Sequence, residues 1–247
     1  MIVVAHLSDT HLDGEPRSVQ RTRKVAEFLN DLPYDLDAVL VTGDVADHGL
    51  AAEYEDARKL LDLRHPTFFC PGNHDDRAEF RRVLLDEAPG DGPINRLHRT
   101  PKAVFALCDS TIPGEDGGHL ADETLDWLAG ALDETPDDVP VFVAFHHQPV
   151  ALHHPYLDSI GQRGPERLAD LVAGRPNVAA ILFGHCHAAV ASSLGGRPLR
   201  SAPGVVNSLR LPWEPGPEVV DHDVPPSLAF HVLDDDGLFQ TTYRTVP

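Results

Sequence analysis

The sequence predicts an α/β fold, in which β-strands alternate along the chain with α-helices. Two observations support this class. Six short apolar runs are rich in β-branched residues, and the segments between them carry apolar residues at the helical period of about 3.6. The chain has 247 residues, enough for one large domain or two small ones. Because no clear linker, repeat or low-complexity tract interrupts it, we expect a single domain over residues 1–247.

The apolar runs are the predicted strands, and the periodic segments between them are the predicted helices. The strands cover residues 2–8, 38–42, 67–70, 103–108, 141–145 and 178–183, and the helices cover 18–32, 50–63, 122–133 and 165–173. Pro165 and Gly174 stand at the start and just past the end of the last helix, as is typical of helix boundaries. Residues 195–247 are rich in Pro and Gly with short apolar runs such as SLAFHVL and LFQTTY, so we expect strands and loops that complete the same domain.

Composition and charge argue against several classes of function. A net charge of −19 disfavours binding of a nucleic acid duplex, whose phosphates attract a basic surface. No segment approaches the roughly 20 apolar residues that span a membrane, and the N-terminal MIVVAHLSDTH lacks the basic region of a signal peptide. The three cysteines, Cys70, Cys108 and Cys186, do not form a disulfide pattern, so we expect a cytoplasmic protein. An anionic substrate would then need a local positive centre, which bound cations supply.

Five of the six predicted strands end in residues that bind metal ions. These residues are Asp9 and His11, then Asp44, then Asn73 and His74, then His146 and His147, and finally His185 and His187. The carboxyl ends of strands form the ligand-binding crevice of open α/β sheets. Carboxylate, imidazole and amide groups together suit Zn, Mn or Fe, whereas structural zinc and iron–sulfur sites are rich in thiolates. The sequence therefore predicts a metal centre at the strand ends.

The spacing of these residues also predicts their orientation. In Asp9-x-His11 and His185-x-His187, an extended backbone places both side chains on the same side. Cys186 then points away from the centre and into packing, as a small apolar side chain does. Glycines at 43, 72 and 184 are expected to permit sharp turns where the chain leaves each strand.

The ordered motifs resemble those of the calcineurin-like metallophosphoesterase superfamily, over residues 1 to about 190. The motifs are Asp9-x-His11, Gly43-Asp44, Gly72-Asn73-His74-Asp75, His146 and Gly184-His185-x-His187. The segments CDSTIPGEDGGHLADETLDWL (108–128) and PGVVNSLRLPW (203–213) look like the branch of class III cyclic-nucleotide phosphodiesterases and glycerophosphodiesterases. The resemblance implies an α/β fold of four layers, an α/β/β/α sandwich with two mixed β-sheets flanked by helices.

The resemblance also implies a dinuclear metal site with assigned ligands. One ion would be held by Asp9, His11, Asp44 and His187, and the other by Asp44, Asn73, His146 and His185, with Asp44 as the bridge. Two ions (Fe, Mn or Zn) would activate a bridging hydroxide for in-line attack on a phosphodiester. His74 would contact the phosphate or protonate the leaving oxygen, with Asn73 and His147 also near the substrate. For His147, support of the neighbouring ligand is the alternative role.

These implications predict a metal-dependent phosphodiesterase acting on small diesters, most of all 3′,5′-cyclic nucleotides. A phosphomonoesterase or nucleotidase, or a glycerophosphodiesterase, could use the same site, and a non-catalytic scaffold is a further alternative, although no ligand position is lost. The run Gly43–Gly49 lacks the arginine of the GDxxDRG pattern of protein serine/threonine phosphatases. The resemblance suggests a homodimer, and it leaves the roles of His153 and His154 open.

Overall fold

Apolar, β-branched runs form a five-stranded mixed sheet in this computed structural model, which describes residues 1–216 and 218–247. Its parallel strands are β1 (Ile2–Leu7), β2 (Ala38–Thr42) and β3 (Thr67–Cys70). The hairpin of β14 (Ser227–Leu233) and β15 (Phe239–Thr245) adds to β1 in antiparallel orientation. The tail of the chain therefore completes the sheet that the first strand begins.

The later apolar runs form a second, six-stranded mixed sheet. Its parallel strands are β5 (Val104–Leu107), β7 (Val141–Ala144), β9 (Val178–Phe183) and β11 (Arg197–Ser201). Its antiparallel edges are β4 (Arg96–Arg99) and β10 (Ala191–Leu194). The central strands β5, β7 and β9 are buried almost throughout, which explains why they read as continuous apolar runs.

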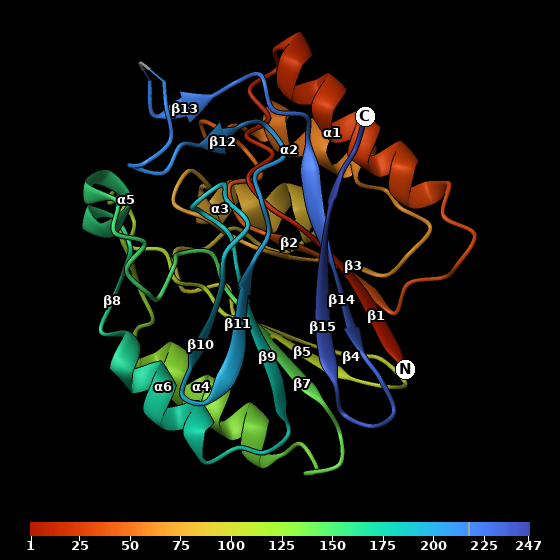
Figure 1. The fold of residues 1–247 in the computed structure, drawn as a ribbon, viewed down its shortest axis with the longest axis vertical. Helices are drawn as coiled ribbons and strands as arrows, with labels where there is room; N and C mark the ends of the chain where they lie inside the picture. Colours follow the sequence, from red (N-terminus) through yellow and green to blue (C-terminus); the bar gives the residue numbers. More distant parts are fainter. Residues whose placement is uncertain (217) are drawn as a thin grey trace.

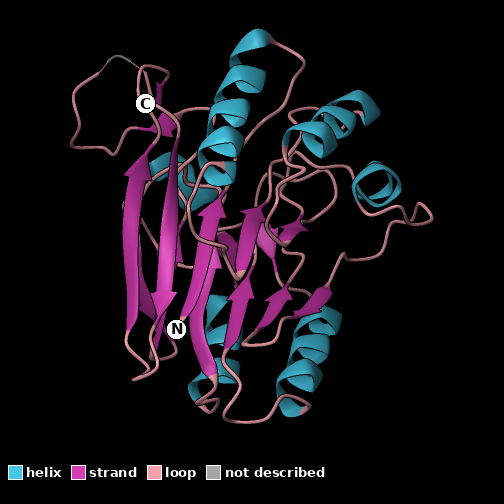
Figure 2. Ribbon diagram, turned by 90° about the vertical axis from the view of Figure 1, so that its right-hand side faces the viewer, coloured by secondary structure: helices cyan, strands magenta, loops and turns pink. Residues whose placement is uncertain are grey.

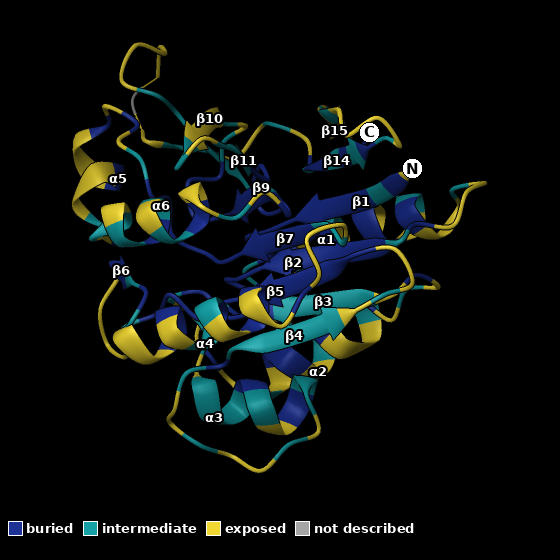
Figure 3. Ribbon diagram, turned by 90° about the horizontal axis from the view of Figure 1, so that it is seen from below, coloured by how far each residue is buried: buried dark blue, intermediate teal, exposed yellow. Residues whose placement is uncertain are grey.

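Four main helices cover the outer faces of the sheets. They are α1 (Pro16–Asn30) and α2 (Ala51–Leu60) on the five-stranded sheet, and α4 (Asp122–Asp133) and α6 (Pro165–Ala173) on the six-stranded sheet. Figure 1 shows the two pairs on opposite sides of the strands, and Figure 2 shows the strands in the middle with helices above and below them. The central strands are buried, whereas the helices expose their outer faces (Figure 3).

Three apolar layers hold these elements together. One lies under α1 and α2 and includes Val25, Leu29 and Tyr54, and another lies under α4 and α6 and includes Leu128 and Leu168. The third lies between the two sheets and includes Val4, Leu40, Phe105, Phe142 and Leu182. Three apolar layers separate four layers of secondary structure, which confirms the predicted α/β/β/α sandwich.

The six predicted strands and four predicted helices are all present, with ends that differ by at most three residues. Both apolar runs of the tail form strands, β14 and β15. The sequence analysis missed the polar edge strands β4 and β10, the short helix α3 (Arg77–Glu79), the π-helical turn η1 (Phe80–Leu84) and α5 (Pro155–Ser159). It also missed two small ribbons, β6 (Gly118–His119) with β8 (Gln162–Arg163) and β12 (Ser208–Leu209) with β13 (Val220–Asp221). Within the described residues, no helix has the length and apolar character to cross a membrane.

A buried chain of polar side chains crosses four strands of the five-stranded sheet. His6 Nε2 lies 2.8 Å from Thr42 Oγ1, and His6 Nδ1 lies 3.1 Å from His231 Nε2. His231 Nδ1 in turn lies 2.9 Å from Thr241 Oγ1. Burial, with the neighbouring His231, lowers the pKa of His6 well below its ordinary value, and burial, with Arg200, lowers the pKa of His231 to about 3. Both imidazoles are therefore neutral in the folded protein.

We expect this pair to make the protein sensitive to acid. Below about pH 6.5 both histidines bind a proton in the unfolded chain but not in the folded one, so the free energy of unfolding should fall as the pH drops. Each histidine contributes a slope of up to about 1.4 kcal/mol per pH unit. Urea unfolding of the metal-free protein at several pH values measures this slope. In His231→Gln the slope of the free energy of unfolding against pH should be smaller by about that amount than in the unaltered protein. An equal slope in the two proteins would contradict a neutral, buried His231.

Candidate metal centre

Loops that leave five strands meet at one end of the two sheets and line a cleft of about 710 Å³. Strands β1, β2 and β3 belong to one sheet, and β7 and β9 belong to the other. The cleft therefore lies at the ends of both sheets and not of one alone. The predicted site residues that line it are His11, Asp44, Asn73, His74, His185 and His187. Asp9 and His146 are fully buried, and they contact the lining residues. The structure therefore brings all seven predicted metal ligands together.

Left-handed backbone conformations aim these side chains into the cleft. The φ angle is 57° at Asp9, 40° at His11 and 47° at Asp44, and it is 66° at His185 and 49° at His187. Residues other than glycine seldom adopt such angles, which cost conformational energy and concentrate at functional sites. The argument from an extended backbone is therefore wrong for both motifs, although each pair does face the same centre.

Hydrogen bonds between loops hold this strained backbone in place. The Asp9 N–H donates to Gly43 O at 3.1 Å, and the His11 N–H donates to Asp44 O at 2.9 Å. The loop after β9 is tied to the same region, because the His185 N–H donates to Asp9 Oδ1 at 3.2 Å. Cys186 is buried in the apolar layer under α4 and α6, which confirms its predicted packing role.

One group of potential ligand atoms comes from Asp9, His11, Asp44 and His187. The Nε2 atoms of His11 and His187 are 3.2 Å apart. Asp44 Oδ2 lies 3.5 Å from His11 Nε2, and Asp9 Oδ1 lies 3.4 Å from His187 Nε2. Bonds of about 2.0–2.2 Å to one metal ion put neighbouring ligand atoms about 3.0–3.5 Å apart, so these spacings suit a shared ion.

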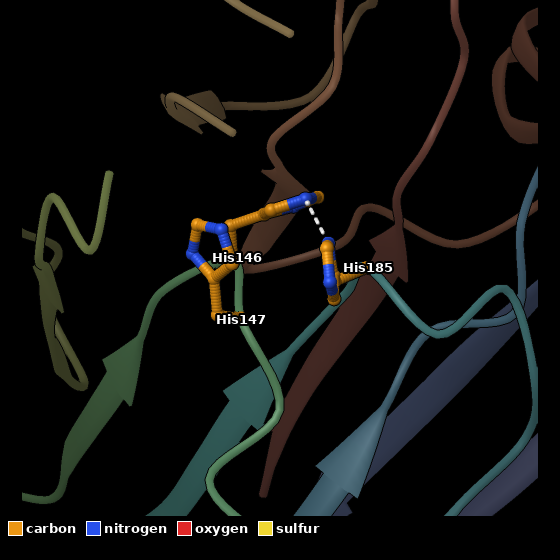
Figure 4. Close-up of side chains that lie close together, drawn as sticks. All are labelled: His146, His147 and His185. Atoms are coloured by element: carbon orange, nitrogen blue, oxygen red, sulfur yellow. Dashed lines mark hydrogen bonds between the residues drawn. The ribbon is translucent and has the colours of Figure 1, made fainter. Parts of the chain in front are cut away.

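A second group of atoms surrounds His146. Its Nε2 lies 3.2 Å from Asp44 Oδ2, 3.2 Å from Asn73 Oδ1 and 3.1 Å from His185 Nδ1. Figure 4 shows the last of these contacts, between the segment after β7 and the segment after β9. Asp44 Oδ2 belongs to both groups. The two groups are therefore adjacent and share one carboxylate oxygen.

The facing atoms of these groups are hydrogen-bond acceptors. His11 Nδ1 lies 2.8 Å from Asp47 Oδ1, and His146 Nδ1 lies 2.7 Å from Thr42 O. Since an ionised carboxylate and a carbonyl oxygen only accept, each Nδ1 carries a proton, and in a neutral imidazole each Nε2 is left with a lone pair. Asp9 Oδ2 is buried and has no hydrogen-bond partner among the described residues. Acceptors that converge in this way lack a cation between them, so the residues fit metal ions.

Without a metal ion, a proton on His146 supplies part of the positive charge that these acceptors need. Although burial lowers it, the Asp44 carboxylate raises the pKa of His146 to about 9. Although burial raises it, His146 holds the pKa of Asp44 well below its ordinary value. Burial raises the pKa of Asp9 to about 6 against the charge of His146. A metal ion bound at His146 would displace this proton, so its binding would be favoured by higher pH.

The remaining predicted residues lie around this centre. The His74 N–H donates to Asp44 Oδ1 at 2.9 Å, and the ring Nδ1 of His74 lies 2.8 Å from Asp47 O, which leaves Nε2 without a partner among the described residues. His147 is fully buried, with Nδ1 2.8 Å from Ser110 Oγ and Nε2 3.2 Å from Asp116 O. Its ring does not line the cleft, and both of its ring nitrogens have partners. Its contact with the substrate therefore stays a prediction.

The two histidines whose roles the sequence left open, His153 and His154, have different surroundings. His154 Nδ1 accepts from the backbone N–H groups of Tyr156 and Leu157, both at 3.2 Å, and so caps α5. His153 is exposed and has a φ of 59°. Neither residue lines the cleft itself.

Close approach, rather than a left-handed φ, requires glycine at 72 and 184. Neither residue has a left-handed φ. A Cβ on Gly72 would lie 2.3 Å from Asp44 Oδ1, and a Cβ on Gly184 would lie 1.9 Å from Ser8 Oγ. The expected turns are present at all three glycines: Gly43 has a φ of 89°, Gly72 O accepts from the Asp75 N–H at 3.1 Å, and Gly184 O accepts from the Cys186 N–H at 2.7 Å.

The sequence analysis missed two side chains that orient the histidines. Asn207 Oδ1 lies 2.7 Å from His187 Nδ1, and Asp47 Oδ1 lies 2.8 Å from His11 Nδ1. Such partners fix the ring and its tautomer in metal sites. Asn207 lies in the 203–213 segment that carried part of the resemblance, and Asp47 lies three residues after Asp44, but neither spacing indicates which ring it contacts.

Comparisons with known proteins agree with this geometry. The sequence profile described as calcineurin-like phosphoesterase matches residues 2–189. A cAMP/cGMP dual specificity phosphodiesterase of Mycobacterium tuberculosis, MT0825, is 34% identical over 212 residues, which cover 81% of this chain and 66% of the relative. The glycerophosphodiester phosphodiesterase GpdQ of Enterobacter lignolyticus is 31% identical over 242 residues, 93% of this chain and 86% of the relative. This chain thus spans just under two thirds of the mycobacterial protein.

A further relative and a solved structure extend the comparison. The 3′,5′-cyclic adenosine monophosphate phosphodiesterase CpdA of Pseudomonas aeruginosa is 30% identical over 249 residues, covering 97% of this chain and 88% of the relative. A dimetal phosphatase from Danio rerio superposes with a TM-score of 0.72 over 100% of this chain and 99% of that one, at 14% identity. At that identity the structural likeness concerns the fold.

We expect Asn207→Ala to weaken metal binding by about 10- to 100-fold, because His187 loses the partner that fixes its ring. Isothermal titration of the metal-free protein with Mn²⁺ measures this change. Asn177→Ala is the matched control, since the Asn177 amide donates to Thr135 O at 3.4 Å and does not line the cleft. Equal affinities in the two variants would contradict the orienting role.

Proposed function

This chain belongs to the calcineurin-like phosphoesterase family, and from that premise we propose that it is a metal-dependent phosphodiesterase of small diesters, above all 3′,5′-cyclic nucleotides. The observation that carries the proposal is the pair of adjacent acceptor groups sharing Asp44 Oδ2 at a cleft of about 710 Å³. A phosphodiester is an anion, and on a chain of net charge −19 it needs a local positive centre.

The proposed ligands are divided between two ions. Asp9, His11, Asp44 and His187 would hold one ion, and Asp44, Asn73, His146 and His185 would hold the other. When bound, the two ions would neutralise the phosphate oxygens and lower the pKa of the attacking water. The metals we propose are Mn, Fe or Zn, because carboxylate, imidazole and amide ligands suit all three.

Residues of the chain itself would position the diester and supply a proton. Asp47 O accepts from His74 Nδ1 at 2.8 Å and so fixes the ring, whose free Nε2 would meet the phosphate or the leaving oxygen. Although burial lowers it, the Asp44 carboxylate raises the pKa of His74, which favours the protonated ring that such a donor needs. Asn73 lines the cleft beside it. His147, behind His146, would support that ligand through the contact with Ser110.

The relatives support diesters as the substrate class, since their names include cyclic-nucleotide and glycerophosphodiester phosphodiesterases. The partner proposed for this chain is accordingly a small molecule. A glycerophosphodiester is the second candidate substrate, favoured by the 31% identity to GpdQ. The cytoplasmic location and the homodimer stay predictions.

We expect the purified protein, loaded with Mn²⁺, to hydrolyse 3′,5′-cAMP and bis(p-nitrophenyl) phosphate. The kcat/KM for the diester should exceed that for p-nitrophenyl phosphate, because this ratio reports selectivity for the transition state. Product release measured for both substrates tests the proposal. No turnover of any diester would refute it, and a larger kcat/KM for the monoester would favour a phosphomonoesterase.

We expect Asp44→Ala to lower diester hydrolysis by several orders of magnitude, because both acceptor groups lose their shared oxygen. Metal content measured by mass spectrometry should fall at both positions, while circular dichroism should show a folded protein. Asp56→Ala is a matched control, since Asp56 is half-buried on α2, pairs with Lys59 and does not line the cleft. Activity retained in Asp44→Ala would contradict the bridging role.

A further inference from the structure

One wall of the cleft is apolar, and the metal centre leaves it without a role. Its side chains come from two separate segments, and they are Tyr156, Leu157, Ile160, Leu209, Val219 and Val220. The first three lie in or beside α5, and the others lie in or beside the β12–β13 ribbon. Figure 1 shows α5 and the β12–β13 ribbon on the same side of the molecule, and residues of both line the one cleft.

Contacts with the rest of the fold hold both segments of this wall in place beside the cleft. His154 caps α5, and Leu157 is buried in the apolar layer under α4 and α6, so the helix is anchored while Tyr156 stays 52% exposed. The ribbon is held by pairing of Leu209 with Val220, and an ion pair joins Arg210 and Asp221 at 2.6 Å. A large aromatic ring is thus kept exposed at a rigid place beside the candidate catalytic site.

We propose that this apolar wall binds the base of a nucleotide substrate, with the base stacked on the Tyr156 ring and the phosphodiester at the metal centre. The inference rests on the proposed function and assigns the side chains that would recognise the base of its nucleotide substrate. The cleft that holds the acceptor groups is the same one that Tyr156 and Val219 line, so one molecule can reach both. Aromatic side chains stack on every base, because each base has a π face.

The chemistry of the wall favours a nucleotide over a glycerophosphodiester. The hydroxyl groups of glycerol would lose water against Leu209 and Val220 without gaining a hydrogen bond, which is unfavourable. A planar base instead buries its apolar faces there. The rest of the cleft carries Arg17, whose guanidinium donates to Val206 O and His222 O, and the carboxylates of Asp13, Asp47 and Asp116. The three carboxylates outnumber this one cation and disfavour a second phosphate group. The occupant that fits is a nucleotide with one phosphodiester and an uncharged ring.

Kinetics of Tyr156→Ala with two diesters test this assignment. For 3′,5′-cAMP we expect kcat/KM to fall about tenfold, mainly through a higher KM. A tenfold change corresponds to the loss of about 1.4 kcal/mol of stacking free energy. For glycerophosphoethanolamine, which has no ring, kcat/KM should change less than about twofold, because it has no base to stack. Tyr156→Phe keeps the ring and should restore the cAMP value. Tyr34→Ala is the matched control, since Tyr34 is 74% exposed and lies outside the cleft.

Two results would overturn the inference. One is an unchanged kcat/KM for cAMP in Tyr156→Ala, and the other is an equal fall for both diesters. Because Tyr156 is exposed, its truncation should leave the fold intact, which circular dichroism checks. Val219→Asp places a charge in the part of the wall that comes from the second segment. It should likewise lower kcat/KM for cAMP more than kcat/KM for the glycerol diester.

Adenosine separates this inference from the proposed function. It carries no phosphate, so its binding depends neither on metal ions nor on hydrolysis. Saturation-transfer NMR with the metal-free protein should detect weak adenosine binding that Tyr156→Ala abolishes and Tyr34→Ala retains. Absence of diester hydrolysis would refute the proposed function alone. Adenosine binding that is undetectable in the unaltered protein, or unaffected by Tyr156→Ala, would refute the base-binding wall.

Discussion

Asp44 Oδ2 lies within 3.5 Å of both His11 Nε2 and His146 Nε2, and most of the surrounding structure is arranged around this crowding of acceptors. Lone pairs of like character repel one another unless a cation lies between them. In the metal-free protein the proton on His146 reduces that repulsion, and bound metal ions would remove it at both positions. The backbone must nevertheless hold the acceptors close together before any ion arrives, so the loops have to be rigid.

Rigidity of the loops comes from buried hydrogen bonds that reach into the core. Asp75 accepts from the N–H groups of Gly72, Val45 and Ala46 at 2.9, 3.2 and 3.0 Å. Its carboxylate also accepts from the Tyr54 hydroxyl at 3.1 Å, and the Tyr54 ring packs in the apolar layer under α1 and α2. The loops after β2 and β3 are thereby fixed to each other and to the core.

The two-sheet architecture serves the same end. The loop after β2 supplies Asp44, whereas the loops after β7 and β9, in the other sheet, supply His146 and His185. The apolar layer between the sheets sets the distance between these loops, since packed interiors resist compression and expansion. Leu40 and Phe142 belong to that layer, so the spacing of the ligands depends on the packing between the sheets.

Much of the fold and the centre could be predicted from local sequence. Buried parallel strands are continuous apolar runs, and amphipathic helices repeat at a fixed period, so β7 and α4 were evident. The edge strand β4, with the sequence RLHR, has neither pattern and was missed. Metal-binding residues at strand ends pointed to the seven side chains that meet at the centre, yet the extended-backbone reason was wrong, because loop contacts impose left-handed angles that spacing does not encode.

By itself, then, the sequence determined the six apolar strands, the four main helices and the side chains that converge, because each leaves a local signature. The tertiary structure alone decided that Asn207 orients His187, twenty residues away, and that Tyr156 and Val219 share a wall of one cleft. These contacts join segments with no common periodicity. Their geometry follows from how two sheets and their loops pack, and local sequence carries no record of that packing.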